Sequence, residues 1–153
     1  MKILILVLMT ILSLHSHAAQ STATAHALRL APGEDPKLAL MNYAKLHKLK
    51  AASVVSAVGS LKTTALRYAN QSTVTTLEGF REVLSLSGTF SDEAAHLHVS
   101  VADDKGAVLG GHLADGSKVY TTLELVVLVY PELIFARETD PQTTFKELVI
   151  KKK

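Results

Sequence analysis

The sequence predicts a single compact α+β domain in which one main helix packs on a mixed, largely antiparallel sheet. Apolar and polar residues alternate over several short segments, which is typical of strands with one buried face. One segment, residues 36–47, follows a helix-start signal and spaces its apolar residues like a helix. The chain has 153 residues, of which 48% are hydrophobic and 20% charged. These values are typical of one ordinary globular domain.

The N-terminal 19 residues have the pattern of a secretory signal peptide. Lys2 supplies a positive charge, residues 3–14 are apolar, and small residues stand at Ser16 and Ala18, where a signal peptidase reads. The apolar run is short for a bilayer span. We therefore expect cleavage after Ala18 or Ala19 rather than an uncleaved anchor. The mature protein is then expected to be secreted or periplasmic, with no membrane span.

The domain is expected to begin with a strand and a helix. Residues 26–31 alternate apolar and polar positions. Asp35 followed by Pro36 supplies a helix N-cap and then a proline at the first helical position. We expect the helix to end near His47. Its predicted buried stripe comprises Leu38, Met41, and Ala44 or Leu46.

The rest of the chain predicts strands. Besides a histidine-bearing hairpin, they are expected at residues 51–58, 61–68, 74–77, 80–88, 119–130 and 132–137, and residues 145–150 are expected to pack the end of the chain back on the domain. Gly59 and Ser60 are expected to end the first of these strands, and the strand at 132–137 is expected at an edge. The core positions predicted for residues 80–88 are Phe80, Val83, Leu84 and Leu86.

Residues 96–113 predict a β-hairpin that carries three histidines. The segment 103–106, Asp-Asp-Lys-Gly, suits a type I turn followed by glycine in the left-handed region, which makes a three-residue loop with a bulge. That turn places Val101 opposite Leu109 and His98 opposite His112. Apolar residues then share one face and the histidines the other, whereas a two-residue turn would move His112 to the core face.

His96, His98 and His112 predict a metal site. Neighbouring positions on one face of a sheet lie about 5–7 Å apart, so their imidazoles can converge on one ion. Three neutral imidazoles with an open fourth position suit Zn²⁺ or a similar divalent metal. The chain has no cysteine, which excludes thiolate ligands and disulfides. The alternative is three unrelated surface or hydrogen-bonded histidines.

Glu124 lies in the middle of the longest apolar strand segment. A buried carboxylate is usually paired. We expect a structural ion pair with Arg67, within one chain or between copies, and the metal site is the alternative partner. Glu124 is also the candidate general base if the metal is catalytic.

Seven pieces of the sequence, in order, resemble the PPC domain, which is conserved in plants and prokaryotes. They are LRLAPGED at 28–35, VGSL at 58–61, LR at 66–67, EVLSLSGT at 82–89, HLH at 96–98, GGHL at 110–113 and TLEL at 122–125. The resemblance assigns residues 25–150 to a stand-alone, prokaryotic-type member. It implies a homotrimer, and a metal ion held on the histidine cluster, which carries over to His96, His98 and His112.

Three functions follow from these patterns. The favoured one is an exported, trimeric binding or assembly module that holds zinc and a small-molecule ligand. The second is a zinc-dependent hydrolase, since zinc lowers the pKa of bound water to about 7, although no nucleophile elbow or phosphate loop is present. The third, DNA binding by family analogy, is least favoured. The net charge is only +2, no Arg-Gly-Arg core of an AT-hook occurs, and export points away from chromatin.

Overall fold

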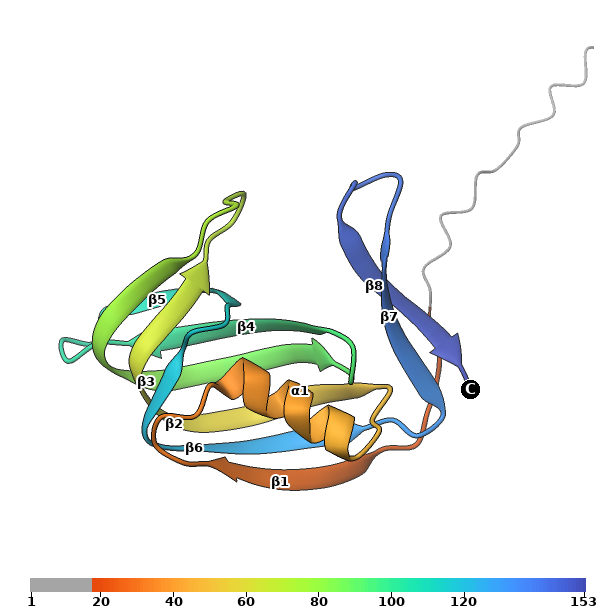
Figure 1. The fold of residues 1–153 in the computed structure, drawn as a ribbon, viewed down its shortest axis with the longest axis horizontal. Coiled ribbons are helices and arrows are strands. Elements are labelled where there is room, and N and C mark those ends of the chain that lie inside the picture. The colour runs from red at the N-terminus through yellow and green to blue at the C-terminus, as the bar shows by residue number, and fades with distance from the viewer. Residues whose placement is uncertain (1–17) are drawn as a thin grey trace, which may run out of the picture.

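A computed structural model describes residues 18–153 (Figure 1), so nearly all of the predicted signal peptide lies outside the described residues. The elements are β1 (Thr24–Leu30), α1 (Pro36–Leu46), β2 (Ala52–Arg67), β3 (Thr75–Phe90), β4 (Ala95–Ala102), β5 (Val108–Leu113), β6 (Lys118–Val129), β7 (Leu133–Thr139) and β8 (Lys146–Lys152). One helix and a strand-rich remainder confirm the predicted α+β class. No helix within the described range is long and apolar enough to cross a membrane.

Six strands form the main sheet, in the order β1-β6-β2-β3-β4-β5, and β7 pairs with β8 in a separate hairpin. The end of β2 also pairs with β5 through Leu66 with Leu113 and Arg67 with His112, so the sheet curls back on itself. All strand pairings within residues 18–153 are antiparallel. The prediction of a mixed sheet was therefore wrong: β2–β3, β3–β4 and β4–β5 are joined by short connections, which can link only antiparallel neighbours.

β2 and β3 are longer than predicted, because the expected breaks lie inside continuous strands. Gly59 has φ 145°, and a Cβ atom built on it would lie 2.1 Å from the Thr122 carbonyl oxygen of β6. The strand pairing shifts register just after it, between Gly59 and Leu61. This glycine marks a bulge and a close backbone approach, not the end of a strand.

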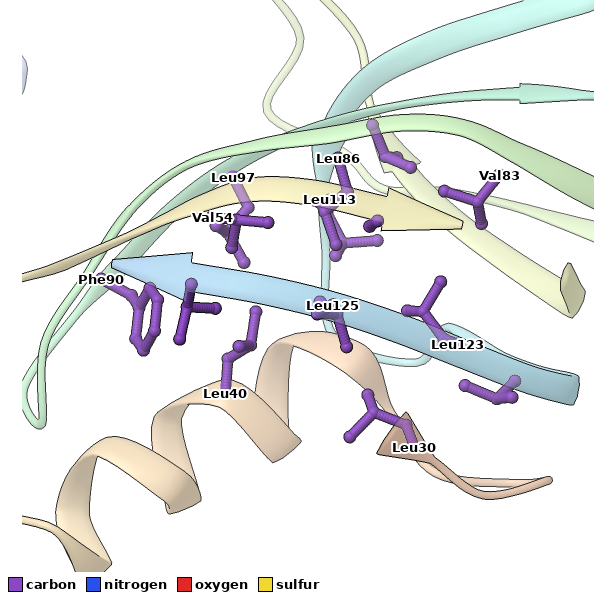
Figure 2. Close-up of a cluster of buried hydrophobic side chains, with 14 of the residues drawn as sticks. Leu30, Leu40, Val54, Val83, Leu86, Phe90, Leu97, Leu113, Leu123 and Leu125 are labelled. Carbon is purple, nitrogen blue, oxygen red and sulfur yellow. The ribbon is translucent and has the colours of Figure 1, made fainter. Parts of the chain in front are cut away.

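The core lies between α1 and the inner face of the sheet (Figure 2), where Leu40 of the helix points toward Leu125 of β6 and Leu30 of β1 lies near Leu123. Asp35 caps α1 as predicted, accepting hydrogen bonds from the amides of Lys37 and Leu38. The predicted stripe was largely wrong: Pro36, Leu40 and Ala44 are buried, whereas Leu38 and Leu46 are exposed. Asp35 also accepts a hydrogen bond from Gly116, which fixes the helix to the β5–β6 turn.

The predicted core positions of β3 are half correct. Val83 and Leu86 are buried, but Phe80 and Leu84 are exposed. The pairing of β3 with β4 shifts register between Val83 and Ser85. This irregularity interrupts the alternation of side chains, so two buried residues are three positions apart instead of two. The predicted edge strand at residues 132–137 is β7, which belongs to the separate hairpin rather than to the main sheet.

Candidate metal centre

The turn of the β4–β5 hairpin has the predicted conformation. The Asp103 amide donates to the Ala107 carbonyl and the Gly106 amide donates to the Asp103 carbonyl, both at 3.0 Å. Gly106 has φ 79°, in the left-handed region that glycine favours. The Asp103 carboxylate accepts from the amides of Lys105 and Ala107 at 2.9 Å. This local network fixes the loop length and therefore the strand register.

The register brings the three histidines together. His98 pairs with His112 and Val101 with Leu109, as predicted. Buried residues Leu97, Val99, Val101 and Leu113 anchor the opposite face of the hairpin in the core. Leu109 is an exception, since 43% of it is exposed although it lies on the predicted apolar face.

The imidazole nitrogens of the cluster are spaced as a metal site requires. One nitrogen from each of His96, His98 and His112 lies within 4.8 Å of the others. The His112 Nδ1 atom is 3.2 Å from His96 Nε2 and 3.1 Å from His98 Nε2. Two nitrogen ligands of a tetrahedral zinc ion, each about 2.0–2.1 Å from the metal, lie about 3.3 Å apart. The three side chains therefore fit a divalent ion with little rearrangement.

Hydrogen bonding alone cannot satisfy this arrangement. An imidazole nitrogen carries either one N–H or one lone pair, so it forms one good hydrogen bond. His112 Nδ1 nevertheless has two imidazole nitrogens within hydrogen-bonding distance. A cation placed among the three nitrogens would use a lone pair from each. The geometry therefore favours a metal site over three merely hydrogen-bonded histidines.

The electrostatic surroundings keep two of these imidazoles neutral. Burial, together with the nearby charge of Arg67, lowers the pKa of His112 to about 4. Burial and the charge of Arg137 also lower the pKa of His96. Metals bind the neutral form of histidine, so protons compete weakly at these two positions near neutral pH.

Arg137 of β7 contacts the cluster, a neighbour that no motif or periodic pattern in the sequence predicted. Its Nη1 atom is 3.2 Å from His96 Nδ1, while Nη2 donates to the Lys146 carbonyl and lies 4.0 Å from a Glu147 carboxylate oxygen. A guanidinium can only donate. The contact therefore makes His96 Nδ1 an acceptor and puts the proton of the neutral ring on Nε2. Coordination through Nε2 requires the proton on Nδ1, so Arg137 must release His96 when a metal binds.

A cavity of about 1010 Å³ opens beside the histidines. His96 and His112 form part of its wall, together with residues of the β2–β3 connection and of the β7–β8 hairpin. Arg67, at the end of β2, and Arg137 of β7 both line it. Its volume is at the upper limit of the range typical of small-molecule sites, about 300–1,000 Å³.

Glu124 does not belong to this site within one chain. It is exposed on β6, where it pairs with Val58 of β2 and Arg29 of β1. Arg67 lies nine residues further along β2 than Val58, a separation of roughly 30 Å at about 3.3 Å per residue. The expected buried pair of Arg67 and Glu124 is therefore not formed within one chain. The same distance removes Glu124 as a general base for the histidines of its own chain.

Comparisons with known proteins agree with this architecture. The family model of the Plants and Prokaryotes Conserved (PCC) domain matches residues 17–131. The chain is 44% identical over 125 residues to the bifunctional protein GlmU of Synechococcus sp. (strain JA-2-3B'a(2-13)), a match that covers 82% of the chain. It spans only about a fifth of the length of the curated relatives it matches.

Two solved structures are also similar. A hypothetical protein from Salmonella enterica is 42% identical with a TM-score of 0.87, and the match covers 90% of this chain and 99% of that one. A metal-containing protein from Archaeoglobus fulgidus is 26% identical with a TM-score of 0.76, and the match covers 88% and 99% of the two chains.

Proposed function

Since the chain belongs to the Plants and Prokaryotes Conserved domain family, we propose that it is an exported, homotrimeric module that binds a metal ion and a small-molecule ligand. The metal is zinc or a similar divalent ion, held by His96, His98 and His112. The observation that carries the proposal is the convergence of three imidazole nitrogens on one point of the β4–β5 hairpin. A relative of the same fold that is metal-containing supports it further.

The proposed trimer would cover an apolar area on the outer face of the sheet. This face carries large exposed side chains from three strands: Val55 and Val58 of β2, Phe80 and Leu84 of β3, and Tyr120 and Val126 of β6. The Phe80 and Tyr120 rings contact each other, with centroids 4.2 Å apart. Exposed apolar areas of this kind commonly mark surfaces where proteins associate.

Export is proposed from the N-terminal sequence pattern alone. The hydrolase alternative lacks its candidate general base, because Glu124 lies far from the histidines of its own chain. No observation in the described residues favours DNA binding over the metal-binding module.

The test is elemental analysis of the purified protein, combined with its mass in solution by light scattering. We expect about one zinc per chain in a trimer. His98→Ala should abolish stoichiometric zinc without dissociating the trimer, because His98 is exposed and anchors no core contact. His47→Ala, at an exposed histidine at the end of α1, is the matched control and should keep its zinc. A wild-type protein that takes up no metal after loading would refute the proposal.

A further inference from the structure

The cavity beside the histidines has an excess of positive charge. Four cationic and two anionic side chains line it: Lys37, Arg67, Arg137 and Lys146 against Asp115 and Glu147. Lys37 is paired with Asp115 at 2.9 Å, and Glu147 is 4.0 Å from Arg137. A divalent ion on the histidines would add to this positive field. Such a cavity attracts a negatively charged ligand.

Arg67 lines the cavity and has more hydrogen-bond donors than the described residues satisfy. Its side chain is half-buried, and within residues 18–153 no carboxylate oxygen lies within 4.0 Å of it. The hydrogen bond it makes is to the Gln71 carbonyl, at 3.2 Å. A guanidinium has five N–H donors in a planar fork that matches a carboxylate or a phosphate. Among the described residues, most of this donor capacity has no hydrogen-bond acceptor.

Arg137 lines the same cavity from the β7–β8 hairpin, and metal binding would free one of its donors. Its present contact with His96 Nδ1 cannot persist once Nδ1 carries the ring proton. The Nη1 group would then lack its present acceptor, while Nη2 keeps its hydrogen bond to the Lys146 carbonyl. The cavity therefore offers two guanidinium groups, and each can form paired, charge-assisted hydrogen bonds with carboxylate or phosphate oxygens.

The cavity also has an apolar part. Val74, before β3, and Phe145, before β8, are 48% and 68% exposed and both line it. These side chains suit the hydrocarbon portion of an organic molecule whose charged end lies at the arginines.

We propose that this cavity binds a small organic anion, with its carboxylate or phosphate oxygens between Arg67 and Arg137 and next to the open coordination position of the metal. This inference rests on the proposed function only in placing the anion next to a bound metal ion. The arginines and the apolar wall would contribute to anion binding without it. The ligand class is therefore an organic acid or a phosphorylated small molecule.

Calorimetric titration of the zinc-loaded protein with benzoate and with inorganic phosphate tests the proposal. We expect binding of at least one probe with a Kd in the millimolar range or tighter. Stronger binding of benzoate would indicate an organic acid, and stronger binding of phosphate a phosphorylated ligand. Arg67→Gln and Arg137→Gln should each weaken binding about fivefold or more, since each removes one charge-assisted pair. Arg29→Gln is the matched control, because Arg29 bonds to Thr122 on the main sheet and does not line the cavity.

Zinc content, measured on the same samples, separates the two proposals. If the protein takes up no zinc after loading but still binds an anion in a way that depends on the arginines, the anion site is supported and the metal site is contradicted. Zinc-loaded protein that binds neither probe at about 10 mM, or equally tight binding by both arginine variants, would overturn the anion site. In cobalt-loaded protein, the bound probe should change the visible absorption of the metal. An unchanged spectrum with a bound anion would overturn its placement beside the metal.

Discussion

Replacing Arg137 with glutamine should make the protein bind zinc more tightly. The guanidinium lies 3.2 Å from His96 Nδ1, so it would be about 7 Å from an ion bound at the other nitrogen of the same ring. At that distance a monovalent and a divalent cation repel by about 1.2 kcal/mol in bulk water, and roughly half of this remains at physiological ionic strength. Breaking the hydrogen bond to His96 costs a further 0.5–1.5 kcal/mol or so.

The combined effect is about 1–2 kcal/mol, which corresponds to at least a fivefold tighter zinc affinity in Arg137→Gln. Glutamine can also accept a hydrogen bond from Nδ1–H, which is the preferred second partner of a metal-bound histidine. Arg137→Lys retains the charge and should gain less. The affinity is measured by competition with a chelating zinc indicator, with Arg29→Gln as the control for loss of positive charge elsewhere.

Part of the gain should disappear at high salt. At about 1 M ionic strength the Debye length is about 3 Å, so the repulsive contribution vanishes while the hydrogen-bond contribution stays. Equal or weaker zinc affinity in a folded Arg137→Gln protein would refute the reasoning. It would show that Arg137 supports the metal ligands rather than competing with the ion for His96.

Three further predictions concern stability. Burial and Arg67 lower the pKa of His112 to about 4 in the folded protein, so the unfolded chain binds more protons between pH 6.5 and 4. The melting temperature of the metal-free protein should therefore fall as the pH is lowered from 6.5 to 4. The fall should be smaller in His112→Ala. Gly88→Ala should destabilise the protein by several kcal/mol in chemical denaturation and reduce its zinc content, because the added Cβ would lie 2.0 Å from the His96 carbonyl oxygen. The control Gly79→Ala also has positive φ but meets no atom closer than 3.9 Å, so it should cost much less. Leu97→Ala, beneath the histidines and 1% exposed, should lower the free energy of unfolding by about 2–5 kcal/mol; a loss below about 1 kcal/mol would show that the hairpin is not anchored there.

The histidine hairpin was predictable because its determinants are local. Asp103 and Gly106 specify the turn, the turn sets the register, and the register aligns His98 with His112. Alternation of apolar residues independently supports the same register. Helix α1 was located for a similar reason, since Asp35 and Pro36 form a local start signal.

The errors came from contacts between distant parts of the chain. The buried face of α1 packs on strands that are distant in the sequence, and Asp35 at the start of the helix is held by Gly116, 81 residues away. Arg137 reaches His96 across 41 residues because β7 and β8 pair with each other outside the main sheet. The separation of Arg67 from Glu124 depends on how β2 aligns with its neighbours. None of these relations leaves a periodic pattern in the sequence.

The three clustered histidines and Arg137 lie on two hairpins that share no strand pairing within the described residues. All three imidazoles belong to β4 and β5, whose turn and core contacts fix them (Figure 1). Changes in β7, β8 or the loop between them would therefore move Arg137 while the three histidines stay in place. Because Arg137 also contacts His96, such changes would alter the affinity for the proposed ion together with the choice of the proposed anion, while the set of side chains that holds the ion stays the same.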